Sequence, residues 1–230
     1  MYRAIILDLD DTLYPEHDYV RSGFQAVARR LEAEAGFSAR ETFEGLRALF
    51  EAGERERTLN RWLRDRRLDE ERWIGPMLRW YREHDPQIEL AAETIEVLDA
   101  LRGRYALGLV SDGRLAQQQK KVAALGIDRW ISAIVLSDVF GRDHWKPSTK
   151  PFEEVLRQLR VSGDSAVYVA DNPTKDFLGA RQLDMGTIRL RRAGGVYSHL
   201  EPPTEKHAPD VEIATLGELP ALLDSPCARK

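Results

Sequence analysis

Short apolar runs that alternate with helical segments constrain the fold of this chain more than any other feature of its sequence. The candidate strands are residues 3–7, 105–110, 133–136, 166–170 and 187–190, with a sixth candidate at residues 211–214. Helical patterns lie between them at residues 91–102, 115–125, 152–159 and 175–183. Continuous apolar runs fit strands buried on both faces. The alternation therefore predicts an α/β protein with a parallel sheet covered on both sides.

Three glycines follow the predicted helices at the point where a left-handed residue often ends a helix. These are Gly126, Gly163 and Gly186, and we expect each of them to cap the helix before it. Residues 194–209 are rich in Gly, Pro, His and Glu. We expect this stretch to be a surface loop.

Residues 15–90 interrupt the alternation, because they contain no convincing strand. Their apolar and charged residues are interleaved at helical spacing, as Leu46, Leu49 and Phe50 illustrate. The pattern predicts three or four helices inserted after the first strand. We therefore expect an α/β core formed by residues 1–14 and 91–230, and an all-helical domain formed by residues 15–90.

Composition excludes several classes of protein. The chain has 230 residues and a formal net charge of −4, so nothing suggests a nucleic-acid partner. Its single cysteine, Cys227, excludes an internal disulfide and a thiolate metal site. We see neither a signal peptide nor an apolar run long enough to cross a membrane, and we expect a cytoplasmic protein without a membrane partner. The oligomeric state is left open.

Acidic residues follow the first and fourth strands. Asp8 and Asp10 come directly after the first strand, and Asp171 ends the fourth, with Asp176 in the first turn of the next helix. In an open parallel sheet, ligands bind beyond the carboxyl ends of the strands. Acids at such places also cap turns and helices. Taken as a site, Asp171 and Asp176 suit a hard cation such as Mg²⁺.

Two further residues suit a phosphate. Ser111 ends the second strand, where a hydroxyl and free backbone amides can hold a phosphate oxygen, although a serine here can also cap a helix. Lys146 is kept extended by Pro147 and can neutralise a phosphate, although a single lysine usually does not. Together, the strand ends supply a nucleophile, an acid/base, positive charge and a metal site, which phosphoryl transfer requires.

The run of residues 8–12, Ser111, Lys146-Pro147 and the run of residues 171–176 together resemble the four ordered motifs of the haloacid-dehalogenase-like hydrolases. The one departure is Ala170, where that family more often has glycine. The resemblance implies a Rossmann-like, doubly wound parallel sheet with an inserted all-helical cap of the subfamily I type. It also implies a Mg²⁺-dependent phosphatase that acts on a small phosphorylated metabolite.

The resemblance also implies a role for each residue. Asp8 attacks phosphorus and forms an aspartyl-phosphate, and Asp10 serves as acid and then as base. Mg²⁺ is bound by Asp8, the Asp10 carbonyl and Asp171, with Asp176 in support. The residues expected to bind or orient the phosphoryl group are Thr12, Ser111, Asp112, Gly113 and Lys146.

Alternatives to a phosphatase remain. A dehalogenase has no use for Asp10, whereas a phosphomutase would use the same residues. A non-catalytic relative would be expected to lack one of the acids. The aromatic and basic residues of the insert, Arg61 and Trp62 among them, suggest a nucleoside 5'-monophosphate or FMN as substrate. Packing of the insert explains the same residues, and a sugar phosphate is the alternative substrate.

Overall fold

The computed structural model describes residues 2–225 and divides the chain into two compact units. One unit contains the described residues up to Glu16 and those from Glu89 onward. The other runs from His17 to Ile88. Cys227 lies outside the described residues.

The first unit is built on a six-stranded sheet in which all neighbouring strands are parallel. The strand order is β3-β2-β1-β4-β5-β6. This sheet, with helices inserted between its first two strands, confirms the predicted fold class. The strands are β1 (Ala4–Leu7), β2 (Ala106–Ser111), β3 (Ala133–Leu136), β4 (Ala166–Ala170), β5 (Gly186–Leu190) and β6 (Val211–Ile213).

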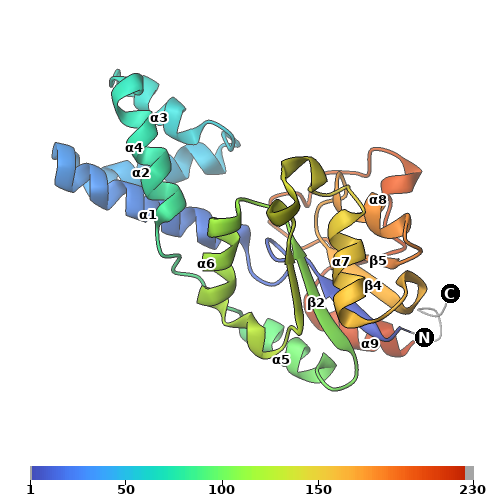
Figure 1. The fold of residues 1–230 in the computed structure, drawn as a ribbon. Coiled ribbons are helices and arrows are strands. Elements are labelled where there is room, and N and C mark those ends of the chain that lie inside the picture. Colours follow the sequence, from blue (N-terminus) through green and yellow to red (C-terminus); the bar gives the residue numbers. More distant parts are fainter. Residues whose placement is uncertain (1, 226–230) are drawn as a thin grey trace. The chain divides into compact units, whose positions relative to one another are not determined.

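Helices cover both faces of the sheet because alternate strand residues point to opposite sides. On one face, Phe152 and Val155 of α7 and Phe177 of α8 pack on Ile6 and Tyr168 of the strands. Figure 1 shows α5 and α6 on the other side of β2 and β3 from α7. The helices of this unit are α5 (Ala92–Leu101), α6 (Leu115–Leu125), α7 (Lys150–Leu159), α8 (Asp176–Arg181) and α9 (Leu219–Asp224).

The order of the strands determines where a ligand can bind. From the central strand β1, the chain builds β2 and β3 on one side and β4, β5 and β6 on the other. The carboxyl ends of the two strands that flank such a reversal leave a crevice between their loops. Asp8 follows β1 at this position, and Asp171 follows the neighbouring β4.

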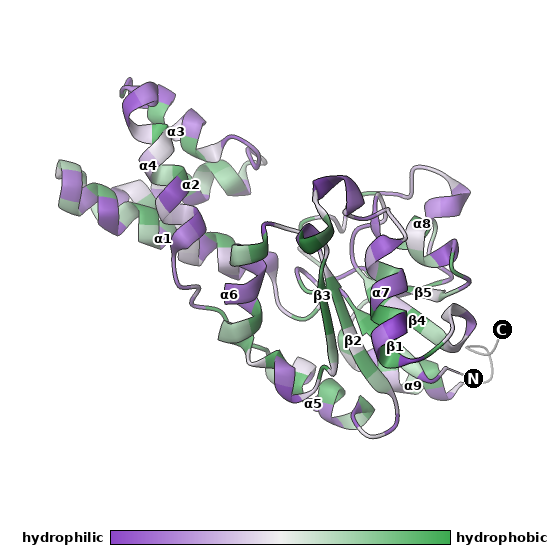
Figure 2. Cartoon of the chain, in the orientation of Figure 1, coloured by the Kyte–Doolittle hydropathy of each residue, from purple (hydrophilic) through white to green (hydrophobic). Residues whose placement is uncertain are grey.

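The second unit consists of helices that share an apolar core. Leu46, Phe50, Trp62 and Met77 are buried in it. Figure 2 shows apolar and polar residues alternating along these helices, as expected where one face of each helix is buried. No helix among the described residues is long and apolar enough to cross a membrane. The helices are α1 (Glu16–Ala35), α2 (Ala39–Glu51), α3 (Thr58–Asp65) and α4 (Glu70–Glu83).

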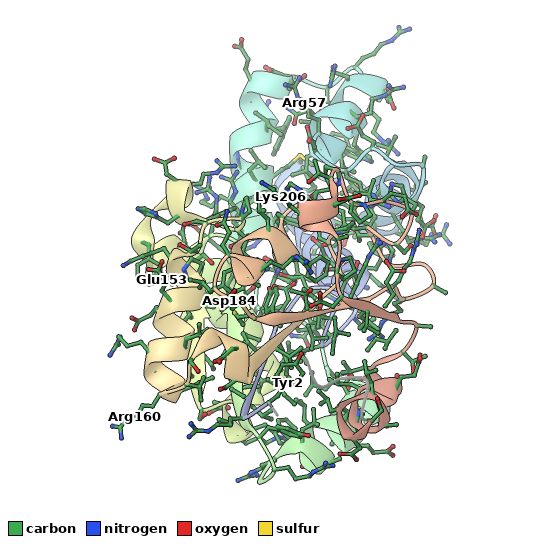
Figure 3. All side chains as sticks on the ribbon, turned by 90° about the vertical axis from the view of Figure 1, so that its right-hand side faces the viewer. Tyr2, Arg57, Glu153, Arg160, Asp184 and Lys206 are labelled. Carbon is green, nitrogen blue, oxygen red and sulfur yellow. The ribbon has the colours of Figure 1, made fainter. Side chains whose placement is uncertain are left out.

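Of the three glycines expected to cap helices, only Gly126 has the left-handed backbone, with φ of 58° at the end of α6. The prediction is wrong for Gly163 and Gly186. The left-handed residues near them are Arg160 (φ 55°) and Asp184 (φ 61°), whose side chains are labelled in Figure 3. Gly163 and Gly186 are needed for close packing instead. A Cβ would come within 1.7 Å of the Leu183 carbonyl oxygen at the first and 2.1 Å of the Tyr2 hydroxyl at the second.

Residues 194–209 contain no strand and only a short 3-10 turn, Glu205–His207, as a loop should. The loop does not lie wholly at the surface, because Val196 is 3% exposed. The buried guanidinium of Arg189 on β5 donates hydrogen bonds to the carbonyl oxygens of Tyr197 (3.1 Å) and Leu200 (2.8 Å). These bonds tie the loop to the sheet.

The positions of Arg160 and Gly163 predict opposite effects of substitution on stability. Arg160→Gly relieves a left-handed conformation that costs an L-residue about 1–2 kcal/mol, and glycine's added chain entropy offsets about 0.5–1 kcal/mol of the gain. We expect its free energy of unfolding to rise by up to about 1 kcal/mol. Gly163→Ala should lower it by about 1–3 kcal/mol, as overpacking does. Urea denaturation measures both, and a destabilised Arg160→Gly would contradict the assignment.

Candidate active site

Four of the predicted residues meet at the carboxyl end of the sheet. Asp8 follows β1, Asp171 follows β4, and Asp176 begins α8. Lys146 lies in the loop between β3 and α7. All four are buried. The parallel strands bring them together from distant parts of the sequence.

The Lys146 ammonium lies between two carboxylates. Its Nζ atom is 2.7 Å from Oδ1 of Asp8 and 2.7 Å from Oδ1 of Asp176. It also donates a hydrogen bond of 2.9 Å to the hydroxyl of Tyr168, a residue of β4. Burial opposes the charge of Lys146, but Asp176 and Asp8 raise its pKa well above the ordinary value. The lysine is therefore a fixed positive charge beside Asp8.

Lys146, with Lys175 nearby, does not balance the carboxylates gathered here. Burial raises the pKa of Asp8 to about 6, even though Lys146 acts to lower it. Burial, followed by the charges of Asp176 and Asp8, raises the pKa of Asp171 well above its usual range. The site therefore has a deficit of positive charge, because ionised carboxylates are costly to bury without partners.

The three carboxylates are arranged to share a cation. One oxygen from each of Asp8, Asp171 and Asp176 lies within 4.8 Å of the other two. Oδ2 of Asp171 is buried and makes no hydrogen bond, which is unusual for a buried polar atom. Three oxygen ligands with an unpaired atom among them fit a hard divalent cation. The residues expected to bind metal are thus compatible with one.

The Asp10 carboxylate lies in a separate group of contacts. Its Oδ1 atom is 2.7 Å from the ammonium of Lys121 and accepts a hydrogen bond from the Tyr14 hydroxyl. Its Oδ2 atom accepts a hydrogen bond of 3.0 Å from the Gln118 amide. Burial alone would raise the pKa of Asp10, but Lys121 and the hydrogen bonds together lower it. Asp10 is therefore held as a carboxylate in this arrangement.

Ser111 and Gly113 both contact Gln118. The amide of Gln118 donates a hydrogen bond of 2.6 Å to Oγ of Ser111. Gly113 has φ of 138°, and a Cβ there would come within 2.9 Å of the Gln118 side chain. Gly113 thus leaves room for Gln118, and its expected contact with phosphate stays a prediction.

Asp112 interacts with the two lysines of the site. Its carboxylate accepts a hydrogen bond of 3.2 Å from the backbone N–H of Lys146 and lies 3.1 Å from Nζ of Lys175. Burial would raise the pKa of Asp112, but Lys146 and Lys175 lower it. The side chain thus anchors the lysine loop, and the expected role of Asp112 at the phosphate stays a prediction.

Thr12 lies in the turn after β1 and is fully buried. Its hydroxyl has no hydrogen-bond partner. A buried hydroxyl without a partner is costly, so a phosphate oxygen that accepted its proton would remove that cost. This observation supports the role expected for Thr12.

The two residues singled out in the insert are placed differently from each other. The Arg61 side chain is 53% exposed and forms an ion pair with Asp65 one turn further along α3. Trp62 is 1% exposed and lies in the core of the helical unit. The guanidinium of Arg66 covers its ring at 4.3 Å from the centroid. The packing interpretation fits Trp62, and the specificity role of both residues stays a prediction.

Gln118 and Lys121 were not predicted as site residues from the sequence. Both lie on α6 at a spacing of three residues, which places them on the same side of a helix. Because α6 directly follows β2, which ends at Ser111, the side chains of Gln118 and Lys121 can reach the residues at the carboxyl end of the sheet. That spacing was the available signal, but polar residues on a helix usually face solvent.

Known proteins resemble this chain over different lengths. The family model described as haloacid dehalogenase-like hydrolase matches residues 2–184. The glyceraldehyde 3-phosphate phosphatase of Methanopyrus kandleri is 30% identical over 95% of this chain and 96% of that protein. The pyrimidine 5'-nucleotidase YjjG of Escherichia coli is also 30% identical, but over 56% of this chain and 54% of its own.

A solved structure shares the fold. The hydrolase YfnB of Bacillus subtilis, solved with magnesium bound, is 19% identical and has a TM-score of 0.68. The match covers 97% of this chain and 99% of that one. At this level of identity, the similarity concerns the fold alone.

The charge deficit predicts an effect of metal on stability. An acid whose pKa is raised in the folded protein binds its proton more tightly there than in the unfolded chain. The free energy of unfolding of the metal-free protein should therefore fall as pH rises above about 3.9, the ordinary pKa of an aspartate, because Asp171 must then ionise in a buried position. Mg²⁺ at about ten times its Kd should restore about 1.4 kcal/mol. We therefore expect Mg²⁺ to raise the melting temperature more at pH 8 than at pH 5.

Asp171→Asn should melt higher than the wild type at pH 8 without metal and should gain little from Mg²⁺. Differential scanning calorimetry with EDTA or Mg²⁺ measures both effects. Asp164→Asn is a matched control, since Asp164 lies in an exposed turn and pairs with Ser162. An equal Mg²⁺-dependent gain in Asp171→Asn and the wild type would contradict the metal site.

Proposed function

We propose that this chain, which belongs to the haloacid dehalogenase-like hydrolases and is a phosphatase of that family, hydrolyses the phosphate monoester of a small sugar such as a triose. The reaction would pass through a phosphorylated Asp8. The observation that carries this proposal is the position of Lys146 between Asp8 and Asp176. This position keeps a fixed positive charge beside the buried carboxylate of Asp8. A carboxylate nucleophile needs such a charge in order to approach an anionic phosphate.

The first half of the proposed reaction forms the intermediate. A carboxylate oxygen of Asp8 bonds to phosphorus while the bond from phosphorus to the ester oxygen breaks. The negative charge of the bound phosphate favours the protonated form of Asp10. In this form, Asp10 gives its proton to the leaving oxygen, which departs as an alcohol. The Lys146 ammonium and the hydroxyls of Thr12 and Ser111 stabilise the charge on the phosphoryl oxygens.

The second half regenerates the enzyme. Asp10, now ionised, takes a proton from a water molecule as the water oxygen bonds to phosphorus. The bond between phosphorus and Asp8 breaks, and inorganic phosphate leaves. Over the whole reaction, one water molecule is consumed: its oxygen ends in the phosphate, and the alcohol gains one proton. The lowered pKa of Asp10 favours this second role, because it keeps the carboxylate ready to accept a proton.

Asp8, Asp171 and Asp176 would hold the divalent cation, which we propose to be Mg²⁺ on the basis of their oxygen ligands. When bound, it supplies the positive charge that the three carboxylates and the substrate phosphate lack. The backbone carbonyl of Asp10 is expected to complete the protein ligands.

A sugar phosphate is better supported than a nucleotide. Two relatives similar along nearly their whole length are named for glyceraldehyde 3-phosphate, whereas the nucleotidase matches over about half. Four rings of the insert suggested stacking on a base, and three of them are buried: Trp62 is 1% exposed, and Trp73 and Trp80 are each 9% exposed. The fourth, Tyr81, is partly buried. Within the helical unit, these tryptophans pack the core instead of offering a flat face to a ligand.

The substrate proposal predicts the ranking of a panel of phosphate monoesters. We expect kcat/KM for glyceraldehyde 3-phosphate to exceed that for UMP and FMN by at least about tenfold, a difference of about 1.4 kcal/mol in transition-state binding. Phosphate release with Mg²⁺ present measures it. A nucleotide or FMN at the head of the ranking would contradict the sugar-phosphate proposal and support the aromatic one.

A further inference from the structure

Helix α6 carries two polar side chains that are buried instead of facing solvent. Gln118 is 2% exposed and Lys121 is 6% exposed. By contrast, Gln119 on the same helix is exposed. Burying an amide or an ammonium is unfavourable unless hydrogen bonds and opposite charge compensate. The partners that compensate here belong to the active site.

The hydrogen-bond partners determine the orientation of the Gln118 amide. Its Nε2 atom lies 3.0 Å from Oδ2 of Asp10 and 2.6 Å from Oγ of Ser111. An ionised carboxylate only accepts hydrogen bonds, so the nitrogen, and not the oxygen, must face Asp10. The same NH₂ group then donates to Ser111. The Ser111 hydroxyl therefore directs its own proton elsewhere, and the phosphoryl group is the acceptor it is expected to meet.

Lys121 completes the set of donors around Asp10. Its ammonium lies 2.7 Å from Oδ1, the oxygen that also accepts from Tyr14, while Gln118 binds Oδ2. Donors on both oxygens fix the rotation of the carboxylate as well as its position. Lys121 is separate in this respect from Lys146, whose ammonium contacts Asp8 and Asp176.

We propose that Gln118 and Lys121 are positioning residues that hold the Asp10 carboxylate in place for both proton transfers, and that Gln118 also turns the Ser111 hydroxyl toward the phosphate. This inference rests on the proposed function, because it requires Asp10 to act as acid and base. Acid–base catalysis depends on the proton donor and acceptor being within hydrogen-bond reach in the transition state. A carboxylate free to rotate would lose that contact for much of the time.

A double-mutant cycle separates positioning of Asp10 from a general structural role. We expect Lys121→Met to lower kcat for p-nitrophenyl phosphate at least about tenfold, a fraction of the 10²–10⁴ contributed by a positioned acid–base group. In an Asp10→Asn background, the same change should cost less than about twofold, because the group it positions is gone. Lys120→Met, one residue away, is the matched control and should leave kcat unchanged.

The leaving group provides a second readout that does not depend on how much of a variant folds. The ratio of kcat/KM for sn-glycerol 3-phosphate to that for p-nitrophenyl phosphate cancels the active fraction. Since an alkoxide needs a proton far more than p-nitrophenolate does, Lys121→Met and Gln118→Leu should lower this ratio at least about threefold. Gln119→Leu should not change it.

Gln118 has a second partner, so it has a test of its own. Gln118→Leu should raise the inhibition constant of inorganic phosphate about threefold to tenfold. This is less than the loss of a whole hydrogen bond to a charged ligand would cause, because Ser111 keeps its hydroxyl and loses only its orientation. In a Ser111→Ala background, it should raise it no further. An equal increase in both backgrounds would show that Gln118 does not act through Ser111.

The outcomes distinguish this inference from the proposed function. Equal losses from Lys121→Met with and without Asp10, together with an unchanged substrate ratio, would overturn the positioning role. An inactive Asp10→Asn beside a fully active Lys121→Met would overturn the inference alone. Wild-type turnover in Asp10→Asn would overturn the acid–base role of Asp10 itself, and the inference with it.

Discussion

The ion pairing of the buried Lys146 ammonium with Asp8 and Asp176 is the interaction on which the rest of the site depends. The ammonium lies 2.7 Å from both Asp8 and Asp176, and all three side chains are almost fully removed from water. Buried charges are tolerated only when they are paired, and removing one partner of such a pair typically costs about 3–5 kcal/mol. The pairing nevertheless leaves negative charge in excess, because Asp171 is buried against the same group. That excess is the charge that a divalent cation would neutralise.

The topology of the sheet creates this arrangement and also divides it into two parts. Because β1 lies between β2 and β4, the residues that follow these strands share one edge of the sheet. In one part, Lys146 of the β3–α7 loop lies against Asp8 and Asp176, and this part would bind the phosphoryl group and the metal. On the β2 side, Gln118 and Lys121 of α6 form the part that holds Asp10. Lys146 thus pairs with Asp8 and Asp176, whereas Lys121 pairs with Asp10, so the nucleophile and the acid–base group have separate cationic partners.

The sequence was most informative where apolar periodicity and strand ends dominate. The run at residues 166–170 matches β4 residue for residue, because a strand buried on both faces has little freedom in composition. Local capping was less predictable: Gly163 and Gly186 are required by atoms distant in sequence, and Arg160 and Asp184 adopt the left-handed conformation instead. The contacts of Gln118 and Lys121 could not be inferred, because composition does not say which polar side of a helix is buried.

The central claim is that Asp8 carries the phosphoryl group during turnover, and trapping that intermediate tests it most directly. The enzyme would be mixed with excess p-nitrophenyl phosphate and Mg²⁺, quenched in acid within milliseconds, and digested for mass spectrometry. We predict a phosphoryl group on the peptide that contains Asp8. It should be lost when hydroxylamine cleaves the acyl-phosphate, and it should be absent from Asp8→Asn. Turnover that leaves Asp8 unmodified at every quench time, or a phosphoryl group on the same peptide of Asp8→Asn, would contradict it.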